Sequence, residues 1–108
     1  MHILEQYIAA LNSGNADQVA ELFADTCKFN DGGARTFQID DLCAEGKEGV
    51  RAAFAGVFSA YQVKATLVKL NEHSMEYDVE LGGMYIPCVG TATCDSAGKM
   101  TEYMVRPR

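Results

Sequence analysis

The sequence predicts an α+β fold in which helices pack on one side of a curved, mainly antiparallel sheet. Apolar residues recur at helical spacing in three segments before residue 62, and four later segments alternate with a period of two. A chain of 108 residues is long enough for one adequate core and too short for a second domain. We therefore expect one domain over residues 1–108, shaped as a half-open cone that encloses a pocket.

Three helices are indicated by their apolar stripes and by the residues at their ends. The first carries Ile3, Leu4, Tyr7, Ile8 and Leu11 and stops at Gly14. The second is capped by Asn15, with a buried stripe of Val19, Leu22 and Phe23. The third begins near Lys47 and carries Val50, Phe54, Val57, Phe58 and Tyr61. Their bulky faces indicate a broad apolar surface beneath them.

A short strand between the second and third helices directs a carboxylate toward the core. Alternation over residues 27–31 places Cys27, Phe29 and Asp31 on one face. The Asn-Asp-Gly-Gly sequence that contains Asp31 is also a strong turn signal, so a turn residue that bonds its own backbone is an alternative role. The following segment, residues 34–46, is predicted to be a structured excursion over the cavity.

Four strands are predicted over residues 63–70, 75–81, 84–94 and 100–106. The two-residue loop Gly82-Gly83 suits a primed turn and fixes the register of the middle hairpin, so that Tyr77 faces Cys88. In the last hairpin one register turns Glu102 inward and the other turns Tyr103 inward. Burying a tyrosine costs less than burying a glutamate, which favours the second register.

Composition excludes several classes of partner. The net charge of −6 and the scattered Lys and Arg residues argue against nucleic acid and against an anionic membrane surface. No apolar run approaches the length of a membrane span, and residues 1–5 do not resemble a signal peptide, so we expect a cytoplasmic protein. The four cysteines lack zinc-ligand spacing and are interpreted as free thiols. No metal or other cofactor is predicted.

Several strings resemble the nuclear transport factor 2-like superfamily, and within it the SnoaL-like polyketide cyclases and ketosteroid isomerases. They are QYIAALNSGNADQVAELFAD, CKFNDGG, GKEGVRAAF and the hairpin around DSAGK, which together span most of the chain. The resemblance implies a conical, cystatin-like α+β barrel with a ligand cavity, and it implies a homodimer.

The resemblance also implies roles for particular residues. Tyr7 is similar to the isomerase phenol that donates to the substrate oxygen, and Asp31 to the carboxylate that carries the proton. Gly90 stands where the isomerases have a second, protonated aspartate, so half of that oxyanion hole is absent. We expect a protein that binds a small hydrophobic oxygenated molecule and isomerises or cyclises it. The alternatives are a non-catalytic binding or association module and, less favoured, a hydrolase or dehydratase.

Five further residues are expected to contact the ligand. Aromatic rings from the third helix, soft side chains from the middle hairpin and the inward tyrosine of the last strand all point toward the predicted cavity. They are Phe54, Phe58, Met84, Cys88 and Tyr103. Each of them also has a simpler interpretation as a packing residue of the core.

Overall fold

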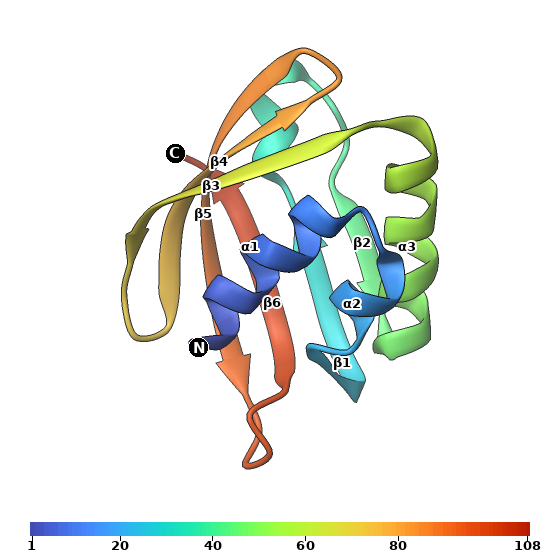
Figure 1. Cartoon of the computed structure of the whole chain (residues 1–108), viewed down its shortest axis with the longest axis vertical. Coiled ribbons are helices and arrows are strands. Elements are labelled where there is room, and N and C mark those ends of the chain that lie inside the picture. The colour runs from blue at the N-terminus through green and yellow to red at the C-terminus, as the bar shows by residue number, and fades with distance from the viewer.

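The computed structural model describes all 108 residues as three α-helices, one 3-10 helix and one six-stranded sheet (Figure 1). The helices are α1 (Ile3–Ser13), α2 (Ala16–Ala20), η1 (Gly33–Phe37) and α3 (Gly46–Ala60). The strands are β1 (Phe23–Asp31), β2 (Leu42–Glu45), β3 (Val63–Leu70), β4 (Ser74–Leu81), β5 (Met84–Cys94) and β6 (Met100–Pro107). This is the predicted α+β class, with helices on one side of a mainly antiparallel sheet.

The sheet runs in the order β2-β1-β6-β5-β4-β3, and only the β1–β6 pair is parallel. In Figure 1 helix α1 lies across the sheet and contacts β3. Helix α3 lies beside β1 and β2, at the right of the view. The inward faces of sheet and helices share one hydrophobic core of 20 buried residues. None of the helices is both long and apolar enough to cross a membrane.

The predicted registers of both hairpins are confirmed. Tyr77 pairs with Cys88 in the β4–β5 hairpin, whose turn residues Gly82 and Gly83 both have positive φ. In the β5–β6 hairpin Tyr103 pairs with Ala92 and is buried, while Glu102 is exposed. A register shift between Thr93 and Cys94 permits this arrangement.

The second helix is shorter than predicted. Asn15 caps α2 as expected, because its side-chain oxygen accepts from the amides of Asp17 and Gln18. However, α2 ends at Ala20, and Phe23 begins β1 instead of completing a helical stripe. Phe23 pairs with Met100 of β6, so pairing with a distant strand overrides the local helical pattern.

The segment after Asp31 contains more regular structure than its sequence suggests. It forms η1 and then β2, which pairs with β1 from Lys28 to Asp31. Strand β2 has only four residues at the sheet edge, too few for a clear period of two. The predicted excursion over the cavity is therefore held to the sheet at one end.

Candidate functional site

A cavity of about 260 Å³ lies between α1, α3 and the inner face of the sheet. Its wall is almost entirely apolar. Its polar groups are the side chains of Tyr7, Asp31 and Tyr77, the acidic pair Asp40 and Asp41, and the hydroxyl of Tyr61. The apolar lining residues include Leu11, Phe54, Val57, Val63, Val79, Leu81, Met84 and Ile86. Such a wall with few polar groups is the usual form of a small-molecule site.

Tyr7 is held on the cavity wall by aromatic packing. Its ring makes an edge contact with Phe54 at 6.3 Å between centroids and a tilted contact with Tyr103 at 4.6 Å. The residue is 1% exposed, and no protein group forms a hydrogen bond with its hydroxyl. The Tyr7 hydroxyl is not fully enclosed by protein, and because Tyr7 lines the cavity, this hydroxyl opens into it.

Burial keeps the Tyr7 phenol protonated. Loss of hydration raises the pKa of Tyr7 well above its ordinary value, and the neighbouring Tyr103 and Asp31 raise it further. A phenol in this state is a hydrogen-bond donor rather than a base. It can therefore stabilise negative charge that develops on a ligand oxygen.

Asp31 is the last residue of β1, between its pairing partners Leu42 and Val105. Its Oδ1 atom accepts a hydrogen bond of 2.9 Å from the amide of Gly33. This is the local Asx turn that the Asn-Asp-Gly-Gly sequence indicates. The Oδ2 atom has no hydrogen-bond partner and is not enclosed by protein, so it is free to meet a ligand in the cavity. The turn and the cavity-facing carboxylate thus use different oxygens of one side chain.

The environment of Asp31 makes it a better base than an exposed aspartate. Burial raises the pKa of Asp31, the Gly33 amide opposes the increase, Asp41 adds to it and Arg106 lowers it. A carboxylate with a raised pKa accepts a proton more readily and can later return it. Part of the Asp31 side chain stays accessible to solvent, so a ligand in the cavity can reach it.

Gly33 has no space for a side chain beside Asp31. A Cβ atom there would lie 2.8 Å from Cys88 Sγ and 3.1 Å from Asp31 Oδ1. The close approach lets the Gly33 amide reach the carboxylate. Burial raises the pKa of the Cys88 thiol to about 12, so Cys88 is a neutral wall residue and not a nucleophile.

The expected ligand contacts divide into two groups. Phe54, Met84 and Cys88 line the cavity. Phe58 and Tyr103 do not: Phe58 packs against Phe54 with centroids 5.6 Å apart, and Tyr103 is fully buried behind the wall. Phe58 stays partly exposed on α3 and Tyr103 is enclosed in the core, so neither borders this cavity.

Two parts of the wall were not among the predicted site residues. Tyr77 lines the cavity and accepts a hydrogen bond from the Tyr103 hydroxyl at 3.0 Å. Ile39, Asp40 and Asp41 line it from the segment between η1 and β2. The predicted register places Tyr77 inward opposite Cys88, so the sequence does contain a signal that Tyr77 could line the cavity. The acidic pair lies in a segment whose apolar residues follow no regular period, so the sequence does not indicate that these two residues face the cavity.

The acidic pair is joined to η1 by one ion pair. Arg35 forms two hydrogen bonds with Asp41, of 2.8 Å from Nε and 2.7 Å from Nη2. The bond with Arg35 lowers the pKa of Asp41 to about 2, so this carboxylate stays ionised. Asp40 has no ion-pair partner and leaves a net negative charge beside the cavity.

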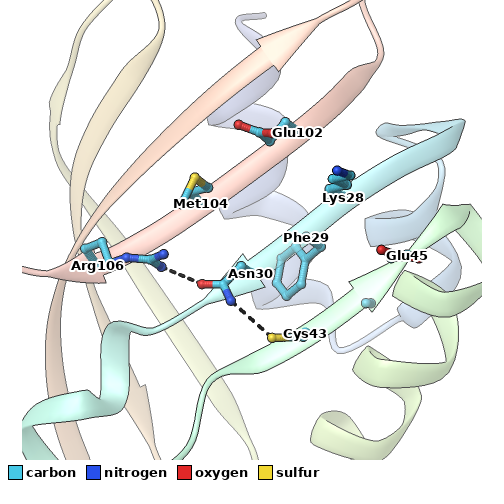
Figure 2. Close-up of a pocket in the computed structure, with 9 residues that line it drawn as sticks. Lys28, Phe29, Asn30, Cys43, Glu45, Glu102, Met104 and Arg106 are labelled. Carbon is cyan, nitrogen blue, oxygen red and sulfur yellow. Dashed lines mark hydrogen bonds between the residues drawn. The ribbon is translucent and has the colours of Figure 1, made fainter.

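A second concavity lies on the outer side of β1, β2 and β6, and Figure 2 shows its polar lining. There Arg106 donates to Asn30 Oδ1, and Asn30 donates to Cys43 Sγ, so that the side chains satisfy one another. Lys28, Glu45 and Glu102 are exposed around it. This surface lacks the apolar enclosure of the inner cavity, so the inner cavity is the stronger candidate.

Comparison with known proteins agrees with the fold. The family model of the SnoaL-like domain matches residues 4–101. The epoxide hydrolase/cyclase-like enzyme SalBIII, reported in pyran ring formation in the polyether salinomycin, superposes with a TM-score of 0.78 at 20% identity, covering 98% of this chain and 88% of that one. An uncharacterized cystatin-fold protein from Novosphingobium aromaticivorans gives a TM-score of 0.75 at 21% identity, with 97% of each chain covered.

A third solved structure is a protein with a ketosteroid isomerase-like fold from Catenulispora acidiphila, in complex with trimethylamine. It has a TM-score of 0.73 and 16% identity, and the match covers 95% of this chain and 82% of that one. At these identities the likeness is one of fold alone. No curated protein matches the chain.

Proposed function

The chain belongs to the SnoaL-like domain family, and on this premise we propose that it binds a small apolar oxygenated molecule and isomerises or cyclises it by proton transfer. One observation carries the proposal. Asp31 Oδ2 and the Tyr7 hydroxyl both lack a protein hydrogen-bond partner, and both residues line the same apolar cavity. A base and an electrophilic donor are the two groups that proton transfer beside a carbonyl requires.

The two groups take distinct roles in the proposed reaction. The ionised Asp31 removes a proton from the carbon next to a carbonyl, and the electron pair moves to the carbonyl oxygen. Tyr7 donates a hydrogen bond to the enolate oxygen that forms. The Asp31 carboxylic acid then returns the same proton to another carbon of the conjugated system, which completes an isomerisation without any co-reactant.

The size of the cavity limits the substrate. A volume of about 260 Å³ equals about nine water molecules at roughly 30 Å³ each. Filled at the interior packing density of about 0.74, it holds about a dozen non-hydrogen atoms. We therefore propose a substrate with one ring or two small rings, because a molecule of that size fills the cavity.

The charges around the cavity favour a neutral substrate. Asp31 and Asp40 line the wall without a cationic partner, whereas the charge of Asp41 is met by Arg35. A ligand that carries a carboxylate or phosphate would be repelled by both unpaired groups. A neutral cyclic carbonyl compound fits the apolar wall and leaves its oxygen for Tyr7.

The isomerisation of cyclohex-3-enone to its conjugated isomer tests the proposal. The product absorbs in the ultraviolet and the reaction needs only the proton transfer described above. Asp31→Asn is expected to lower kcat/KM by about 10²- to 10⁴-fold, the usual contribution of a positioned base. Tyr7→Phe is expected to lower it by about 10²-fold or more, as for loss of an oxyanion donor.

Asp25→Asn is the matched control, since Asp25 is an exposed carboxylate on the same strand and does not line the cavity. It should retain the wild-type rate. Equal rates in wild type and Asp31→Asn would exclude proton transfer by Asp31. Thermal stabilisation by the ketone without turnover in wild type would instead identify a non-catalytic ligand-binding domain.

Homodimeric assembly and a cytoplasmic location, both predicted from the sequence, stay predictions. Sedimentation velocity of the full chain tests the first of them. The partner that we propose for the cavity is the small neutral molecule described above.

A further inference from the structure

Two buried tyrosines stand one behind the other at the wall of the cavity. Tyr77 of β4 is 1% exposed and lines the cavity, whereas Tyr103 of β6 is completely buried and does not. Their hydroxyl oxygens are 3.0 Å apart. Tyr103 is also in ring contact with Tyr7, so the three tyrosines form one cluster beside Asp31.

The direction of the bond between the two hydroxyls follows from their surroundings. The Tyr103 hydroxyl has no hydrogen-bond partner other than Tyr77. A buried hydroxyl that does not donate is costly, so the Tyr103 proton points to the Tyr77 oxygen. The Tyr77 proton must then point elsewhere. No protein acceptor pairs with it, and Tyr77 borders the cavity, which leaves a ligand there as its acceptor.

Gly90 explains why Tyr103 can stand behind Tyr77. The Tyr103 hydroxyl occupies the space that a Cβ atom at Gly90 would need. In the resemblance to ketosteroid isomerases, position 90 corresponds to the acid that forms half of the oxyanion hole. A side chain at position 90 and the hydroxyl of Tyr103 therefore exclude each other.

We propose that Tyr77 is a second hydrogen-bond donor to the ligand oxyanion, beside Tyr7, and that Tyr103 is the positioning residue that directs the Tyr77 proton into the cavity. This inference rests on the proposed function of the cavity, because it supplies the donor that the missing acid would have provided. The hydrogen bond that Tyr77 accepts from Tyr103 also polarises the Tyr77 hydroxyl, which strengthens the hydrogen bond that Tyr77 donates to the ligand.

The protonation of the cluster is consistent with donation. Burial, and next the neighbouring Tyr103 and Tyr7, raise the pKa of Tyr77 well above its ordinary value. The phenol therefore keeps its proton at neutral pH. A donor that cannot ionise there is suited to an oxyanion and not to base catalysis.

Binding of 4-nitrophenolate tests the donor role without relying on turnover. This phenolate has ten non-hydrogen atoms, which suits the cavity, and its visible absorption shifts when its oxygen accepts hydrogen bonds. The measurement uses the full chain with Asp31→Asn, so that the carboxylate of Asp31 does not repel the probe. Added to that variant, Tyr7→Phe and Tyr77→Phe should each weaken phenolate binding about 10- to 100-fold, as expected for bonds to a charged acceptor.

Tyr103→Phe should weaken binding less, by about two- to tenfold, because Tyr77 keeps its proton but loses the contact that directs it. It should also move the absorption of the bound phenolate toward that of a less hydrogen-bonded anion. Tyr85→Phe is the control, since Tyr85 is 54% exposed and lies outside the cavity wall. The neutral ether 4-nitroanisole should bind all variants equally, which separates loss of donation from loss of folding.

The outcomes separate this inference from the proposed function. Binding that depends on Tyr7 but is unchanged by Tyr77→Phe would overturn the role of Tyr77 alone. Binding unaffected by both changes, or no phenolate binding at all, would overturn the oxyanion site itself. Should Tyr77→Phe fail to fold, the spectral shift in Tyr103→Phe decides, and an unchanged spectrum counts against the inference.

Discussion

The hydroxyl of Tyr103 and the Cα of Gly90 face each other so closely that no side chain fits between them. Both residues are buried in neighbouring strands of the sheet, so neither can move aside without disturbing the core. The absence of an acid at position 90 and the presence of a tyrosine at position 103 are therefore one structural feature.

Introducing an acid with Gly90→Asp is expected to destabilise the protein. The new side chain would overlap the Tyr103 ring and bury a carboxyl group. We expect the free energy of unfolding to fall by about 3 kcal/mol, from overpacking and loss of hydration together. Urea denaturation measures the change.

The double variant Gly90→Asp/Tyr103→Ala is the control for this prediction. Removing the ring makes room for the aspartate, so the two changes together should cost at least about 1 kcal/mol less than their sum. Simple additivity of the two losses would show that Tyr103 is not what excludes a side chain at position 90.

Asp31→Asn is expected to stabilise the protein increasingly as pH rises. Because burial raises the pKa of Asp31 above its ordinary value of 3.8, the folded state holds this proton more tightly than the unfolded state. That contribution to stability is complete below pH 3.8 and is lost as pH rises through the raised pKa. Asparagine has no such loss and can still accept from the Gly33 amide.

Urea unfolding at pH 3.5 and pH 7 compares the two proteins. The gain from Asp31→Asn should be larger at pH 7, and Asp25→Asn serves as the control for an exposed carboxylate of the same strand. A gain that is equal at both pH values would mean that Asp31 is not desolvated in the folded state.

The sequence predicted the parts of the fold that depend on strong local patterns. The Gly82-Gly83 turn fixed which side chains of β4 and β5 point inward, and that register extends to Tyr77 and Cys88. Phe23 was misplaced because its pairing partner Met100 is far along the chain. Distant pairing leaves no local signal in the residues that it captures.

The same distinction holds for the candidate site. A helical stripe, a two-residue period and a family resemblance predict Tyr7 and Asp31 as site residues, and both line one cavity in the structure. Tyr103 was predicted to point inward, which is correct, but a register cannot tell whether an inward side chain reaches the cavity or lies behind another ring. The ring of Tyr103 packs against Tyr7 and its hydroxyl against Tyr77, and those two residues line the cavity while Tyr103 does not. Only the three-dimensional structure shows this order.

Gly33→Ala is expected to disturb Asp31 and to lower both stability and activity. The added methyl group would lie 2.8 Å from Cys88 Sγ and 3.1 Å from Asp31 Oδ1, so at least one of them must shift. We expect a loss of about 1–3 kcal/mol in unfolding free energy. Chemical denaturation and the ketone isomerisation assay measure the two effects.

Gly56→Ala is the matched control for this change. Gly56 lies within α3 and has nothing within 4 Å of the position of a new Cβ. Alanine should stabilise the helix by up to about 1 kcal/mol there. Combining Gly33→Ala with Cys88→Ala should recover part of the loss, and no recovery would show that the clash with Cys88 is not its cause.

The Arg35–Asp41 ion pair is expected to make the segment between η1 and β2 sensitive to acid. Arg35 lowers the pKa of Asp41 from 3.8 to about 2. The folded state therefore gains stability from this group above pH 3.8 and loses it as pH falls toward 2. Arg35→Gln removes the cation, so stability should depend less on pH within that interval. The exposed position of the pair limits the size of the effect at high salt.

Unfolding free energies measured across this acidic range in low salt show the difference in pH dependence between wild type and Arg35→Gln. Arg51→Gln is the control, because the carboxylates that pair with Arg51 lie on and beside α2 and α3. Limited proteolysis at pH 7 gives a second readout, since replacing Arg35 removes the ion pair that holds Asp41 to η1 and leaves only the backbone hydrogen bonds of Gln38 and Ile39 to η1. Faster cleavage within 38–41 in Arg35→Gln but not in Arg51→Gln is the expected result. Identical acid profiles and identical cleavage in both variants would show that the ion pair does not hold this part of the cavity wall.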